Sequence, residues 1–90
     1  MAVKIEGLPF RATQDQIYDF FAGYEVVRSS LIFGLQNDGR KSGLGFIIFE
    51  NEEEAYKVCI EKNDKFIGSR YVELSQISYG QYKSYANQYC

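Results

Sequence analysis

Two short segments, Val3–Glu6 and Gly43–Phe49, constrain the fold of this chain most. The first alternates apolar and polar side chains, which is typical of a half-buried strand, and Gly7-Leu8-Pro9 breaks it. The second follows the turn signal Asn37-Asp38-Gly39. It is therefore expected to form a hairpin with a strand at Leu31–Leu35. The chain is organised around a sheet.

Two helices are predicted between the strands. Thr13, with Gln16 three residues later, has the pattern of a capping box, and an apolar face begins at Ile17. Gly23 is expected to end this helix. Asn51 is the expected N-cap of the second helix, whose first turn is acidic and suits the helix dipole.

The last strand is predicted at Arg70–Ser75, after a short extended piece at Phe66-Ile67 and a turn at Gly68-Ser69. The order β-α-β-β-α-β specifies an α+β fold in which a four-stranded antiparallel sheet carries two helices on one face. Alternation along the strands assigns the two faces. The side chains expected to face the helices are Val3, Ile5, Ile47, Phe49, Val72 and Leu74, and those expected on the open face are Lys4, Glu6, Leu44, Phe46, Ile48, Tyr71 and Glu73.

The chain is expected to divide into a domain of residues 1–75 and a C-terminal extension of residues 76–90. Tyrosines recur in the extension at helical spacing, although Gly80 weakens the pattern. Two alternatives stand: a third helix that lays these tyrosines on the open face of the sheet, or a flexible tail. The tyrosines concerned are Tyr79, Tyr82, Tyr85 and Tyr89.

Composition excludes several classes of function. Ninety residues make one small domain, and no apolar run approaches the length of about 18 residues that a membrane span needs. The chain has no histidine, no nucleophile beside a base and no glycine-rich phosphate loop, so we expect no catalysis, no metal and no cofactor. Its two cysteines, Cys59 and Cys90, fit a reducing compartment better than a disulfide.

The net charge of −2 argues against tight binding of phosphate, but the charges are unevenly distributed along the chain. Four acidic residues gather between Glu50 and Glu54 at the start of the second helix. Basic residues fall instead in or beside the predicted loops. They are Arg11, Arg40, Lys41 and Arg70.

The segments Val3–Phe10 and Ser42–Phe49 resemble the paired motifs of RNA recognition motif (RRM) domains. More specifically, three pieces are similar to the quasi-RRMs of the heterogeneous nuclear ribonucleoprotein F/H group: Gly7-Leu8-Pro9-Phe10, Gly39-Arg40-Lys41-Ser42-Gly43 and Gly68-Ser69-Arg70-Tyr71-Val72-Glu73. The resemblance spans residues 2 to 75. Of the three positions where an ordinary RRM stacks bases, Lys4 and Leu44 are not aromatic and only Phe46 is. Sheet stacking is therefore not expected to supply most of the affinity.

The resemblance implies that the loops bind short guanine tracts in single-stranded RNA. It assigns base stacking to Phe10 and a basic contact to Arg40. Arg70 and Tyr71 match the Arg-Tyr pair that enters the last strand and contacts the RNA in the family. Arginine suits this role because its guanidinium can donate two hydrogen bonds to guanine O6 and N7. The cations Lys4, Arg11 and Lys41 complete the predicted RNA-binding set.

One position departs from the family pattern. Members of the group often carry a basic residue where this chain has Glu6. A carboxylate there repels phosphate, although it can accept hydrogen bonds from guanine N1–H and N2–H. Phe10 also has a second interpretation, as an apolar staple for the first helix, and each arginine has a second interpretation as a solvated charge.

The family implies a monomeric domain of a larger splicing or RNA-processing factor, nuclear and in some relatives cytoplasmic. The alternative function is a protein-interaction module that binds peptides through its helices, to which the acidic Asp15 and Asp19 would contribute. Such modules usually carry Arg-x-Phe before the last strand, whereas this chain has Lys65-Phe66. This difference favours RNA over peptide.

Overall fold

The computed structural model describes residues 1–89, and Cys90 lies outside the described part. A four-stranded antiparallel sheet has the order β2-β3-β1-β6. Its strands are β1 (Ala2–Glu6), β2 (Ile32–Leu35), β3 (Lys41–Ile48) and β6 (Glu73–Ile77). A separate hairpin joins β4 (Phe66–Ile67) to β5 (Arg70–Tyr71). The predicted α+β arrangement is confirmed.

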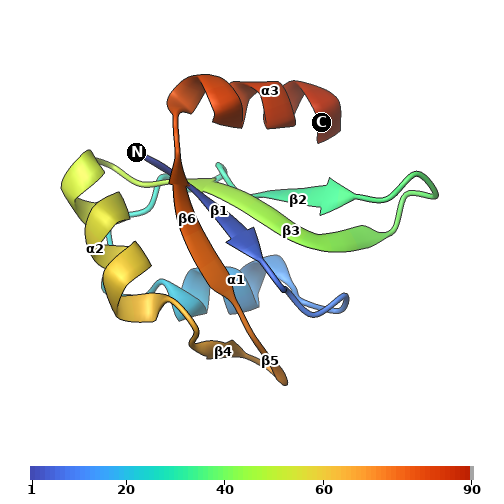
Figure 1. The fold of residues 1–90 in the computed structure, drawn as a ribbon, viewed down its shortest axis with the longest axis horizontal. Coiled ribbons are helices and arrows are strands. Elements are labelled where there is room, and N and C mark those ends of the chain that lie inside the picture. Colours follow the sequence, from blue (N-terminus) through green and yellow to red (C-terminus); the bar gives the residue numbers. More distant parts are fainter. Residues whose placement is uncertain (90) are drawn as a thin grey trace.

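Three helices cover the sheet. Figure 1 shows α1 (Gln14–Phe20) and α2 (Glu52–Lys62) on one side of it and α3 (Tyr79–Tyr89) on the other. The main core lies between the sheet and the first two helices, and includes every side chain that the sequence assigned to that face. The helix caps also agree with prediction: Thr13 and Gln16 form a complete capping box, and Asn51 accepts a hydrogen bond from the Glu54 amide.

The first helix is shorter than predicted. It ends at Phe20 rather than at Gly23, because the chain tightens into turns in which Ala22 N–H donates to Asp19 and Tyr24 N–H donates to Phe21. Gly23 lies within these turns with a φ of +92°. Its left-handed conformation serves the turn and not the helix cap.

The predicted last strand, Arg70–Ser75, is wrong in its bounds. Residues 70–71 pair with β4, and the strand that pairs with β1 runs from Glu73 to Ile77. The division falls at Val72, whose backbone N–H and C=O both bond to the segment before β4, at Lys65 and Asp64. Tyr71 therefore belongs to the hairpin, where its ring packs edge-on against Phe66, and it does not fill the face under the tail.

The tail forms a third helix, which is the first of the two alternatives that the sequence left open. Tyr82 is buried in a second apolar cluster with Ala2, Ile32 and Phe46, and its hydroxyl donates to the Ser30 carbonyl. Tyr85 stacks on Phe46. The helix α3 thus covers the face of the sheet that α1 and α2 do not cover.

Candidate nucleic-acid interface

The loop from β1 to α1, residues 7–13, is fixed on both sides by other parts of the chain. The Leu8 amide donates to the Gly43 carbonyl of β3 at 3.0 Å. On the other side, the turn of the β4–β5 hairpin at Gly68 lies close to the Pro9 ring. Three segments that are distant in sequence therefore meet at one end of the molecule.

Lys41 holds the same loop from the sheet. Its ammonium donates to the Ala12 carbonyl at 2.6 Å and lies 4.0 Å from the centre of the Phe33 ring. In both contacts the positive charge of Lys41 interacts with other groups of the same chain. The structure thus gives Lys41, predicted as an RNA contact, a role in positioning the loop, and no pattern in the sequence indicates this role.

Phe10 projects from this loop with 61% of its surface exposed. It is not the apolar staple of α1, since Ala12 next to the N-cap is buried instead. Phe10 lines a cavity of about 520 Å³ together with Gln36, Arg40 and Lys41. The structure therefore brings together an exposed aromatic ring and two of the predicted cations, Arg40 from the β2–β3 loop and Lys41 from the start of β3.

Arg40 is oriented by Asp38 within the same turn. Its Nε and Nη2 lie 2.8 Å and 2.7 Å from Asp38 Oδ2, and its amide donates to Oδ1. The hydrogen bond from the Arg40 side chain holds the pKa of Asp38 below its usual value. Because a guanidinium has further N–H donors, the edge turned away from Asp38 is left for a ligand.

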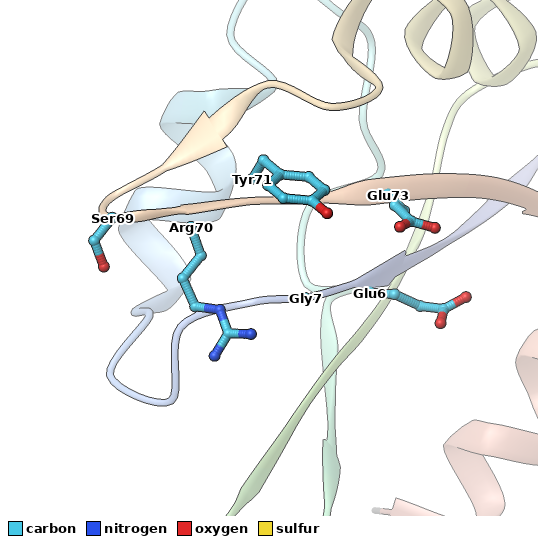
Figure 2. A pocket seen from close by; sticks show the side chains of 6 residues that line it. All are labelled: Glu6, Gly7, Ser69, Arg70, Tyr71 and Glu73. Atoms are coloured by element: carbon cyan, nitrogen blue, oxygen red, sulfur yellow. The ribbon is translucent and has the colours of Figure 1, made fainter.

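Arg70 and Tyr71 line a second cavity, of about 400 Å³. Its other lining residues are Glu6, Gly7, Ser69 and Glu73. Figure 2 shows Arg70 at one end of this pocket, the two carboxylates at the other and the Tyr71 ring between them. The pocket thus offers a guanidinium, an exposed aromatic ring and carboxylate acceptors within one small volume.

Gly7 makes the pocket possible. Its φ is +86°, and a Cβ at this position would lie 2.9 Å from the Tyr71 carbonyl oxygen. Glycine is therefore required here for two reasons, the left-handed backbone and the close approach of β1 to β5. Any larger residue would push Tyr71 away from the end of β1.

The remaining predicted contacts do not line these cavities. Arg11 is exposed and lines neither of them. Lys4 is on the sheet, with its ammonium 3.3 Å from the Glu6 carboxylate. Five lining residues were not among the predicted site residues: Glu6, Gly7, Gln36, Ser69 and Glu73. All but Gln36 lie within the motif segments Val3–Phe10 and Gly68–Glu73, so only Gln36 had no signal in the sequence.

The sheet face where an ordinary RRM stacks bases is closed. Phe46 is fully buried, and the rings of Tyr85 and Tyr89 stack over it. Leu44 and Ile48 pack in the same cluster. Phe46 is thus out of reach of a ligand in this structure, whereas the rings of Phe10 and Tyr71 are exposed.

A family model described as "RRM domain" matches residues 3–86. The human RNA-binding protein 12 is 38% identical over 72 residues, which cover 80% of this chain and 8% of that protein. Heterogeneous nuclear ribonucleoprotein F from Bos taurus is 33% identical over 85 residues, covering 94% of this chain and 20% of that protein. The chain spans a small fraction of the length of these curated relatives.

Solved structures agree with these matches. The crystal structure of the Glorund qRRM2 domain superimposes with a TM-score of 0.84 at 31% identity, covering 93% of this chain and 96% of that one. A human G-rich RNA sequence binding factor 1 structure gives 0.82 at 26% identity, covering 97% and 89%. The chain belongs to the RRM domain family. Within that family it is a quasi-RRM of the heterogeneous nuclear ribonucleoprotein F/H group.

Residues 1–89 contain no group of three or more side chains suited to hold a metal ion. No helix among them is long and apolar enough to cross a membrane. RRM domains are in general RNA-binding and non-enzymatic.

Proposed function

We propose that this domain binds single-stranded G-rich RNA through its loops, as part of a splicing or RNA-processing factor. The observation that carries the proposal is a contrast in exposure. Phe46 is buried under α3, whereas Phe10 and Tyr71 remain 61% and 54% exposed beside Arg40 and Arg70. Bases can stack only on rings that they can reach.

The relatives support the same ligand. One structural neighbour is a G-rich RNA sequence binding factor, and one curated relative is a heterogeneous nuclear ribonucleoprotein. Arginine can recognise guanine through O6 and N7, and stacking adds affinity for any base. A single domain with net charge −2 is expected to bind weakly, and tandem copies on one chain would raise the affinity. The family also suggests a nuclear location.

Binding of Arg70→Ala to a fluorescently labelled G-tract RNA tests the proposal. We expect about a tenfold loss of affinity, the effect of losing one good arginine contact to a base. Arg28→Ala is the matched control, because Arg28 lies on the Tyr18 ring away from both cavities and should bind as the wild type does. Equal affinities for G-tract and U-tract RNA in the wild type would contradict the proposal.

A second candidate function is protein binding through α2. Tyr56 and Ile60 are exposed on this helix and line a cavity with Glu53 and Glu61. A basic, partly apolar peptide would fit such a surface. Binding there would be indifferent to Arg70→Ala and sensitive to Ile60→Asp, so the two candidate functions separate in one set of variants.

A further inference from the structure

Two carboxylates on adjacent strands of the sheet line the cavity that also contains Arg70. Glu6 on β1 and Glu73 on β6 are directly opposite in the antiparallel register. Side chains in such pairs have their Cβ atoms about 4.5–5.5 Å apart, and like charges there are destabilising. Figure 2 shows both side chains projecting in the same direction from the two strands. The pair thus works against the stability of the fold.

Only one member of the pair is neutralised within the described residues. The Lys4 ammonium lies 3.3 Å from Glu6, whereas no salt bridge or hydrogen bond of residues 1–89 involves the Glu73 carboxylate. Arg70 lines the far end of the cavity and Lys4 pairs with Glu6 from outside it, so these two cations balance the formal charge of the two carboxylates. Phosphate repulsion at the pocket is therefore moderate, and Glu73 is left as an acceptor without a donor.

We propose that Glu73 reads the Watson–Crick edge of a guanine held in this cavity, an inference that rests on the proposed function. Guanine presents two adjacent donors on that edge, N1–H and N2–H, and a carboxylate can accept both. Uracil, cytosine and adenine each place an acceptor beside their donor, which a carboxylate repels. In single-stranded RNA this edge is free.

The remaining groups of the pocket fit the other parts of the same base. A guanine lying on the Tyr71 ring with its N1–H edge toward Glu73 turns O6 and N7 toward the end where Arg70 lies. Glu6 stays paired with Lys4, so the negative charge of Glu6 repels the RNA less. Relatives often carry a basic residue at the position of Glu6. Because Glu6 is paired with Lys4, guanine selection in this chain is expected to depend on Glu73 and Arg70.

Replacing guanosine by inosine removes only the N2 amino group, so the ratio of the two affinities measures recognition of that group. The RNA is a short G-tract and the same strand with inosine in the tract. We expect the wild type to prefer guanosine about tenfold, the order of one hydrogen bond to a charged group. In Glu73→Gln this preference should fall to about twofold, since an amide offers one acceptor oxygen and turns its own donors toward the base.

Glu50→Gln is the matched control. It removes the same charge at the end of the sheet opposite Glu6, at an exposed position, and should keep the wild-type ratio. Amide NMR spectra of both variants verify that each is folded; Glu73→Gln should be at least as stable as the wild type because it removes a like-charge pair.

The outcomes separate the inference from the proposed function. A guanosine preference that is unchanged in Glu73→Gln, while Arg70→Ala still loses G-tract binding, overturns the inference alone. A wild type that binds G-tract and U-tract RNA equally overturns both. A Glu73→Gln variant that loses more affinity for the guanosine strand than for the inosine strand supports the inference.

Discussion

The ring of Tyr85 lies parallel to the ring of Phe46, with the two centroids 4.0 Å apart and an angle of 14° between the planes. Phe46 is the one aromatic residue that this chain keeps at the base-stacking positions of the sheet. A tyrosine of the same chain therefore occupies the place that a base would take. The RNA-binding account depends on this contact, because it removes Phe46 from the surface that bases can reach and leaves Phe10 and Tyr71 as the exposed rings beside Arg40 and Arg70.

The stack should contribute to folding as well. Tyr85→Ala removes a packed aromatic ring, and we expect a loss of about 2 kcal/mol in the free energy of unfolding. Urea unfolding followed by circular dichroism measures it. Tyr79→Ala is the control, since Tyr79 lies on the same helix but is half exposed, and it should cost less than about 1 kcal/mol. Equal losses would mean that α3 is not docked through Tyr85.

The close approach at Gly7 predicts an unequal effect of two alanine substitutions. Gly7 and Gly39 have nearly the same positive φ, +86° and +88°, but only at Gly7 would a Cβ meet another atom, the Tyr71 carbonyl oxygen. Gly39→Ala should therefore cost about 1 kcal/mol, the penalty for the left-handed conformation. Gly7→Ala should cost more by at least about 1 kcal/mol and should shift the amide signals around Tyr71. Identical unfolding free energies would contradict the described packing of β1 against β5.

Lys41 predicts a stability effect at a position that resembles an RNA contact. Lys41→Met removes the charged hydrogen bond to the Ala12 carbonyl and the contact with Phe33, with an expected loss of about 1–2 kcal/mol. Lys65→Met makes the same change at an exposed side chain and should be nearly neutral. Denaturant unfolding compares the two. An unchanged free energy of unfolding in Lys41→Met would mean that the Lys41 ammonium is solvated and does not hold the loop.

The carboxylate of Glu54 predicts a dependence of stability on pH. It accepts a hydrogen bond from the Glu25 amide at 2.9 Å and pairs with Lys57, and the first of these contacts chiefly lowers its pKa below 4.5. A lowered pKa in the folded state stabilises the fold above the unfolded pKa, and that stabilisation is lost as the pH falls through the folded value. Glu54→Gln should therefore be less stable than the wild type at pH 7.

The same comparison at lower pH provides the test. The difference between wild type and Glu54→Gln should shrink as the pH falls below 4.5. Glu53→Gln, at an exposed position on the same helix turn, should show a small difference at every pH. A Glu54→Gln difference that stays constant down to pH 3 would argue against the charged hydrogen bond.

The order of elements could be predicted from the sequence because local signals and strand alternation agree. The capping box at Thr13, the turn before β3 and the apolar alternation of β1 each act over a few residues. The end of β5 could not be predicted, because it depends on the hydrogen bonds between Val72 and the segment before β4. Likewise, the docking of α3 was one of two open alternatives, since it depends on the fit of its tyrosines to Phe46.

The candidate site divides in the same way. The exposed aromatics and arginines of the loops were found from motifs, and their role in RNA binding stays a prediction. The internal contacts of Lys41 and Arg40, and the opposition of Glu6 and Glu73, come from tertiary structure. No motif or periodicity reports which cation is already paired inside the protein.

The most direct test of the account is an NMR titration of the isotope-labelled domain with a short G-tract RNA and a U-tract of equal length. The account predicts shifts at Phe10, Arg40, Arg70, Tyr71 and Glu73 with the G-tract only, while Phe46 and the residues of α3 remain unchanged. Shifts centred on Phe46 and Tyr85 with either RNA would contradict it, because they would mean that α3 leaves the sheet and bases stack on the surface that it covers.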